Sequence, residues 1–190
     1  MQLRSCLLIA ALAGQLISVP SILAQRSQTK TENEHMDEGI KKMMTSSDTM
    51  FAMKAAQAGI AEVKLGQLAV TKASNADVKA FAREMVEDHT RANEQLKSIA
   101  VQNGMTLPST MDAKDQAVYD KLSNESVAQF DRAYMRSMVK DHQQDIKAFN
   151  KEARGGKSPQ LKQFAQQTTP TLERHLQMAR SAETKVKSGS

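Results

Sequence analysis

The sequence has one cysteine, no tryptophan and few aromatic residues of any kind. The cysteine is Cys6, and Phe, Trp and Tyr together make up 4% of the 190 residues. Strands favour aromatic and β-branched side chains, whereas helices favour Ala, Met, Gln, Lys and Glu, which are frequent in this chain. The composition therefore predicts an all-α protein whose stability comes from packing and not from disulfide bonds.

The sequence also lacks the patterns that mark several classes of function. No run of Lys and Arg is long enough for a nucleic-acid patch, although the formal net charge is +5. There is no glycine-rich phosphate loop, and no serine or cysteine stands in a recognisable catalytic motif. We therefore expect a binding or structural protein and not an enzyme, with no nucleic-acid partner. Its mixed surface charge permits weak association with an envelope surface.

The first 24 residues have the pattern of a secretory signal peptide. Arg4 supplies a positive charge, residues 6–19 form an apolar stretch, and Ala24 provides a small residue at the expected cleavage site. The apolar stretch is too short to be a comfortable membrane span. We expect residues 1–24 to be removed, residues 25–47 to form a flexible tether and residues 48–187 to form one domain. The predicted location is the periplasm or the outer-membrane surface, with no transmembrane span in the mature protein.

Apolar residues recur at helical spacing in four long stretches. These stretches cover about residues 48–72, 77–102, 123–155 and 159–186. Asp48 and Ser123 are the expected caps of the first and third helices, and Pro170 should bend the fourth. A short helix over residues 112–122 lies in the long join between the second and third. The pattern predicts a four-helix bundle whose long connection either crosses the bundle or folds over one end.

A Met-Val-x-Asp-His pentad occurs twice, ending at His89 and at His142. At ~100° per residue, His142 lies in the middle of its apolar face and His89 lies roughly 40° to one side. His175 is central to the apolar face of the fourth stretch, and Glu62 is central to that of the first. Counting residues from the turns places the four side chains in one layer if the two hairpins are modestly offset.

These four residues suggest two functions that the sequence does not separate. A carboxylate on an apolar face is costly unless it is hydrogen-bonded, paired or bound to a metal. Three imidazoles and one carboxylate could bind a divalent Zn, Mn, Fe or Cu ion, with Asp88 and Asp141 orienting the ligands. That hypothesis describes an exported metal-binding bundle in envelope or stress physiology. The alternative is a structural or interaction bundle, in which a metal-free Glu/His layer fixes helix register and the partner is an unidentified protein or a second copy.

Residues 59–66 (GIAEVKLG), the first pentad and His175-Leu176 resemble an exported bacterial family of unknown function. That family is placed in the ferritin-like superfamily and its members are often labelled outer-membrane proteins. The resemblance covers about residues 48–186 and implies a ferritin-like four-helix bundle, but no established activity. Di-iron ferritins carry Glu-x-x-His on two helices, whereas here valine or leucine stands three residues before each of the three histidines. Ferroxidase chemistry is therefore not expected.

Overall fold

The structure is a computed structural model that describes residues 46–188. All regular structure in this range is helical: α2 (Ser46–Lys72), α3 (Ala76–Gln102), α4 (Ala113–Asn124), α5 (Val127–Gly155) and α6 (Pro159–Ser188). The predicted signal peptide and residues 25–45 of the predicted tether lie outside the described residues. None of these five helices is both long enough and apolar enough to cross a membrane.

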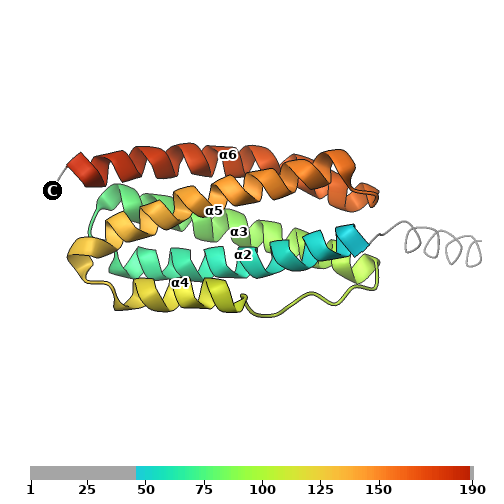
Figure 1. Cartoon of the computed structure of the whole chain (residues 1–190), viewed down its shortest axis with the longest axis horizontal. Helices are drawn as coiled ribbons and strands as arrows, with labels where there is room; N and C mark the ends of the chain where they lie inside the picture. Colours follow the sequence, from blue (N-terminus) through green and yellow to red (C-terminus); the bar gives the residue numbers. More distant parts are fainter. Residues whose placement is uncertain (1–45, 189–190) are drawn as a thin grey trace, which may run out of the picture. The chain divides into compact units, whose positions relative to one another are not determined.

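The four long helices form two antiparallel hairpins that pack side by side. α2 pairs with α3 and α5 pairs with α6, while α3 also packs on α6 and α2 packs on α5 (Figure 1). The chain from α3 to α5 returns along the length of the bundle, and α4 forms the second half of this return, against α2 and α5. The predicted ferritin-like four-helix bundle is thus confirmed, and its long connection crosses the bundle and does not fold over one end.

Two predicted helix caps are wrong. α2 begins at Ser46, so Asp48 lies within its first turn. The Asp48 carboxylate instead accepts a hydrogen bond of 2.8 Å from the backbone N–H of Lys157, in the join between α5 and α6. Ser123 lies in the last turn of α4, where its hydroxyl donates to the carbonyl of Asp120, and Ser126 is the cap residue of α5. Ser46 and Ser47 therefore belong to the bundle and not to the tether.

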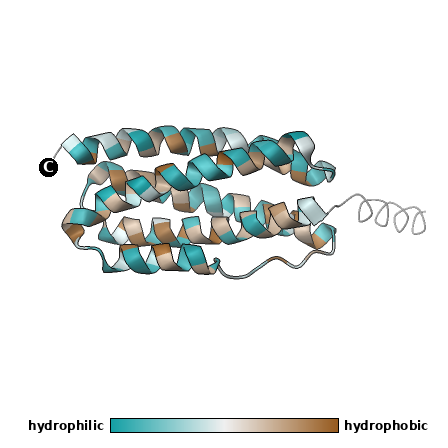
Figure 2. Cartoon of the chain, viewed as in Figure 1, coloured by the Kyte–Doolittle hydropathy of each residue, from teal (hydrophilic) through white to brown (hydrophobic). Residues whose placement is uncertain are grey.

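The core consists of two apolar clusters with a polar layer between them. One cluster includes Leu65, Phe81, Met138 and Ala179, and the other includes Ala52, Leu96, Phe149 and Leu172. Glu62, His89, His142 and His175 each fall between the contributions of their own helix to the two clusters. Figure 2 shows the underlying pattern, in which hydrophilic and hydrophobic residues alternate around every helix. The predicted layer therefore lies at mid-height, with apolar packing above and below it.

Close approach of α2 and α3 depends on a small residue. A Cβ added to Gly66 would lie 2.8 Å from Cγ2 of Val86 and 3.1 Å from the carbonyl oxygen of Ala82. Contacts this short require a shift of backbone or of a branched side chain, so any larger residue would separate the helices. Gly66 thus sets the spacing of the first hairpin.

Candidate metal centre

Three histidines from three helices lie together in the polar layer: His89 of α3, His142 of α5 and His175 of α6. One ring nitrogen from each lies within 4.8 Å of the corresponding nitrogen of the other two. All three side chains are buried. Helical periodicity directs each histidine towards the bundle interior, and the equal depth of the three positions brings them into contact. The structure therefore assembles three of the four predicted ligands.

Hydrogen bonds to the protein fix the tautomers of two of these rings. Nδ1–H of His142 donates to the carbonyl oxygen of Met138 at 2.9 Å, because that oxygen can only accept. Nε2–H of His175 donates to Oδ2 of Asp88 at 3.0 Å. In the neutral rings, Nε2 of His142 and Nδ1 of His175 are then both unprotonated, and these two nitrogens face each other at 3.4 Å.

This separation fits two nitrogen ligands of one metal ion. Two nitrogens bound tetrahedrally at about 2.0–2.1 Å from a Zn²⁺ ion lie about 3.4 Å apart. Two facing lone pairs repel each other unless a proton or a cation lies between them. His89 adds a third candidate, since its buried Nε2 has no hydrogen-bond partner in the described structure. The donor set is thus three imidazole nitrogens that lie within 4.8 Å of one another.

The surroundings keep all three rings neutral, which is the form that binds metal. Burial and the neighbouring His175 together lower the pKa of His142 to about 4. Burial also lowers the pKa of His89 well below its ordinary value, with added repulsion from the other two histidines. Burial lowers the pKa of His175 too, although its bond to Asp88 opposes this shift. A proton shared between the rings is therefore disfavoured near neutral pH.

Asp88 connects the centre to charged groups on the α3/α6 face. Its Oδ2 accepts from Arg174 at 2.7 Å as well as from His175, and its Oδ1 accepts from Arg91 at 3.1 Å. Arg174 forms a second ion pair with Glu84. Asp88 is thus the predicted orienting carboxylate, but it orients the histidine of α6 and not its own neighbour in the sequence.

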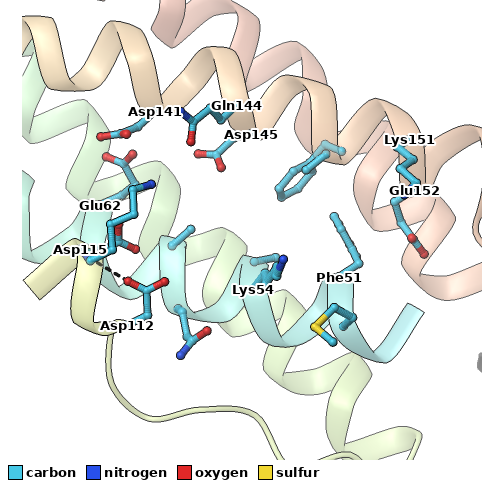
Figure 3. A pocket seen from close by; sticks show the side chains of 18 of the residues that line it. Phe51, Lys54, Glu62, Asp112, Asp115, Asp141, Gln144, Asp145, Lys151 and Glu152 are labelled. Carbon is cyan, nitrogen blue, oxygen red and sulfur yellow. Dashed lines mark hydrogen bonds between the residues drawn. The ribbon is translucent and has the colours of Figure 1, made fainter. Parts of the chain in front are cut away.

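Glu62 and Asp141 lie on the other side of His142. Oε1 of Glu62 is 3.9 Å from Nδ1 of His142, the nitrogen that faces away from the other histidines. Asp141 accepts a hydrogen bond from the hydroxyl of Ser137 and points with Glu62 into a cavity between α2, α4 and α5 (Figure 3). The structure therefore does not bring Glu62 or Asp141 to the space between the three histidines.

Sequence reasoning missed several polar residues near the layer. Arg174 and Glu84 complete the network around Asp88. Tyr134 is buried and its hydroxyl has no hydrogen-bond partner in the described structure. Arg174 precedes His175 in the chain, and that adjacency was an available signal. Tyr134 looked like an ordinary core residue, and nothing in its spacing marked it as polar.

A small cavity on the α3/α6 face gives access to the centre. It has a volume of about 180 Å³, and its lining includes Asp88, His89, Gln95, Thr171 and His175. His142 lies deeper and is fully buried. An ion entering here would pass the Asp88 carboxylate before it met the ring nitrogens.

Residues 33–182 match the family described as Domain of unknown function (DUF4142), and the chain belongs to that family. No curated protein matches the chain.

Two solved structures have similar folds. One is a DUF305 fragment from Deinococcus radiodurans, with a TM-score of 0.67 and 15% sequence identity, covering 75% of this chain and 98% of its own. The other is CopM in its Cu(I)-bound form, with a TM-score of 0.63 and 16% identity, covering 74% of this chain and 98% of its own. At these identities the similarity concerns the helical fold alone.

Proposed function

For this member of the DUF4142 family, we propose that His89, His142 and His175 bind one transition-metal ion, with copper(I) as the preferred ion. The observation that carries the proposal is the pair of unprotonated nitrogens of His142 and His175, facing each other at 3.4 Å. A metal-free polar layer would use a donor to satisfy each acceptor. Here the N–H groups of His142 and His175 are both directed away, to Met138 and to Asp88. The arrangement therefore favours a cation between the rings.

The charge of the site favours a monovalent ion. The three ligands are neutral imidazoles in a buried layer, and Glu62 lies beyond His142 and not among them. A divalent ion would bring two positive charges into this layer, whereas Cu⁺ brings one, so the cost of burying the ion is lower for Cu⁺. Imidazole also suits copper and zinc better than it suits manganese, which prefers oxygen ligands. The fold shared with Cu(I)-bound CopM supports the same choice.

We also propose that the protein is exported by residues 1–24 and acts in the periplasm or at the outer-membrane surface. The signal-peptide pattern supports export. In this location a buried three-histidine centre would hold or buffer copper as part of envelope or stress physiology. An unidentified protein partner, or a second copy of the chain, would interact with the protein while it holds copper.

A titration of copper(I) into purified, untagged and chelator-stripped protein tests the proposal. Measured anaerobically against a competing coloured chelator, the protein should bind one Cu⁺ per chain, and His142→Leu should lower the affinity at least 100-fold. His35→Ala is the matched control, since His35 lies outside the described bundle, and it should bind as the wild type does. A parallel Zn²⁺ titration should show weaker binding at the same residues.

Two results would contradict this function. Absence of stoichiometric binding by the wild type would leave the metal-free bundle as the better account, in which the layer serves helix register. Equal loss in His142→Leu and His35→Ala would place the copper outside the bundle. Circular dichroism of each variant shows whether the helical fold survives, and His142→Leu is expected to fold because apolar side chains often replace buried polar ones without loss.

A further inference from the structure

A second, larger cavity lies between α2, α4 and α5, and the charged residues that line it are mainly acidic. Its volume is about 800 Å³, which is within the range of small-molecule sites. Six carboxylate side chains line it: Glu62, Asp112, Asp115, Asp141, Asp145 and Glu152. Three lysines also line it: Lys54, Lys114 and Lys151. The cavity therefore carries an excess of negative groups, although the whole chain has a positive net charge.

At one end of the cavity, carboxylates from three helices point towards the same space. Figure 3 shows Glu62 of α2, Asp115 of α4, and Asp141 and Asp145 of α5 converging there. Oε2 of Glu62 is buried and has no hydrogen-bond partner, so a polar atom is aimed into the cavity without a donor to meet it. At this end of the cavity, the chain therefore provides more hydrogen-bond acceptors than donors.

The positive charges of the chain do not compensate these acids. Burial, together with the negative charges of Asp141 and Asp115, raises the pKa of Asp145 to about 7, although Lys114 opposes the shift. The pKa remains raised although one ammonium group acts on it. A further positive group placed among these carboxylates would therefore be stabilised.

A second acid, Glu152, lies towards the other end of the cavity, and Figure 3 shows the apolar side chain of Phe51 between it and the four converging carboxylates. Ala55 and Phe149 also belong to the apolar part of the lining. Glu152 follows Asp145 by seven residues, or about 10 Å along α5. Its Oε1 is also buried without a hydrogen-bond partner. Acidic groups thus stand at two separated places with an apolar wall between them.

We propose that this cavity binds a linear aliphatic polyamine. Its ammonium groups would donate charge-assisted hydrogen bonds to the carboxylates, and its methylene chain would lie against the apolar wall, as lysine stems lie on apolar surfaces. A single metal ion fits less well, because no three of these carboxylates bring oxygens within 4.8 Å of one another, whereas the three histidines do bring their nitrogens that close. The polyamine site is separate from the copper centre and does not depend on it.

Calorimetric titration of the full chain with spermidine tests this site. We expect one saturable site in the wild type and at least a ten-fold loss of affinity in Asp115→Asn/Asp145→Asn. The matched control, Glu94→Gln/Glu173→Gln, removes the same charge from exposed positions on α3 and α6 and should bind within two-fold of the wild type. Titrations with Mg²⁺ and Ca²⁺ under the same conditions should show no comparable dependence on the cavity residues.

Three outcomes would overturn the proposal. One is that spermidine does not bind the wild type. Another is that the cavity pair and the control pair lose affinity equally, which would mean only general electrostatic attraction. The last is that Mg²⁺ or Ca²⁺ binds tightly through Asp115 and Asp145 while spermidine does not, which would make the cavity a hard-cation site. Because His142→Leu leaves these carboxylates in place, it should bind spermidine normally even if copper binding fails.

Discussion

The histidine centre and the acidic cavity meet at His142 but present different donor atoms in different surroundings. The centre offers three neutral nitrogens in a buried layer, with the N–H groups of His142 and His175 already directed to protein acceptors. The cavity offers carboxylate oxygens beside an apolar wall, in a space of about 800 Å³. The first is suited to a single transition-metal ion and the second to an extended organic cation. Polar residues of one layer can therefore serve two ligands when helix packing separates nitrogen from oxygen.

The two sites are joined by a row of contacts. The row starts at the cavity, where Oε1 of Glu62 lies 3.9 Å from Nδ1 of His142. Nε2 of His142 then lies 3.4 Å from Nδ1 of His175, and Nε2 of His175 lies 3.0 Å from Oδ2 of Asp88. His142 is the divider, because its Nδ1 faces Glu62 and its Nε2 faces the other rings. Substitutions on either side of His142 should therefore separate the properties of the two regions.

The largest expected effect is the loss of metal-dependent stabilisation in His142→Leu. A ligand that binds only the folded state at a free concentration of 1,000 Kd stabilises it by about 4 kcal/mol. For a domain of this size that raises Tm by about 8–16 °C. Thermal melts with and without Cu⁺ should show this rise in the wild type and at most about a third of it in His142→Leu, whose affinity is expected to be at least 100-fold lower. A full rise in the variant would remove His142 from the metal site.

Opposite pH dependences should distinguish the two regions in chelator-stripped protein. The folded-state pKa of His142, about 4, lies below its ordinary 6.5, so the unfolded chain takes up the proton first. The contribution of neutral His142 to the free energy of unfolding is complete above pH 6.5, and about 3 kcal/mol of that free energy is lost as the pH falls to 4. Asp145 has its pKa raised from 3.8 to about 7, so its contribution is complete below pH 3.8 and is lost as the pH rises to 7.

Urea unfolding of two variants between pH 4 and pH 8 measures how the free energy of unfolding changes with pH. His142→Leu should lack the destabilisation that protonation of His142 causes at low pH. The free energy of unfolding of this variant, relative to that of the wild type, should therefore decrease as the pH rises. Asp145→Asn should lack the destabilisation that ionisation of Asp145 causes at high pH. The free energy of unfolding of this variant, relative to that of the wild type, should therefore increase as the pH rises. Parallel curves for both variants and the wild type would mean that neither group titrates as its burial indicates.

A weaker effect is expected from Asp88→Asn, which keeps the shape of the group that holds His175. Loss of such an orienting carboxylate typically lowers metal affinity 10–100-fold. Glu87→Gln is the control, because Glu87 is exposed and pairs with Arg91 on the surface. Copper titration of both variants should show the loss in Asp88→Asn alone. Wild-type affinity in that variant would show that the bond to Asp88 does not set the tautomer of His175.

The smallest effect concerns the ammonium group that the chain already supplies to the cavity. Lys114 lowers the pKa of Asp115, Asp141 and Asp145 by its positive charge, and its side chain is exposed. Lys114→Gln should raise spermidine affinity about five-fold, since one nearby unit charge in water is worth about 1 kcal/mol. Calorimetry should show this gain, and Lys185→Gln, at an exposed position near the end of α6, should show none. A loss of affinity in Lys114→Gln would mean that the lysine helps to bind the ligand.

Periodicity was sufficient to predict the bundle and the members of its polar layer. A helical period identifies the face on which Glu62 and the histidines lie, and the turns identify their depth. Periodicity cannot tell which helix stands beside which. Asp88 and Asp141 occupy the same place in the two pentads, yet Asp88 binds His175 because α3 packs on α6, and Asp141 faces the acidic cavity because α5 packs on α2.

The acidic cavity could not be predicted because α4 forms part of its wall. Asp112 looked like an ordinary cap at the start of a short helix, and it does accept a hydrogen bond from the backbone of Asp115. Only the course of the crossover, along α2 and not over the end of the bundle, brings Asp112 and Asp115 opposite Glu62.

The hairpin arrangement also determines how bound copper would change local opening. His89 belongs to the α2/α3 hairpin, whereas His142 and His175 belong to the α5/α6 hairpin, so an ion held by all three ties the two units together. Separation of the hairpins would then require release of the ion, whereas fraying of helix ends would not. In amide hydrogen exchange, copper should slow the protons that exchange by hairpin separation and leave those of the terminal turns unchanged.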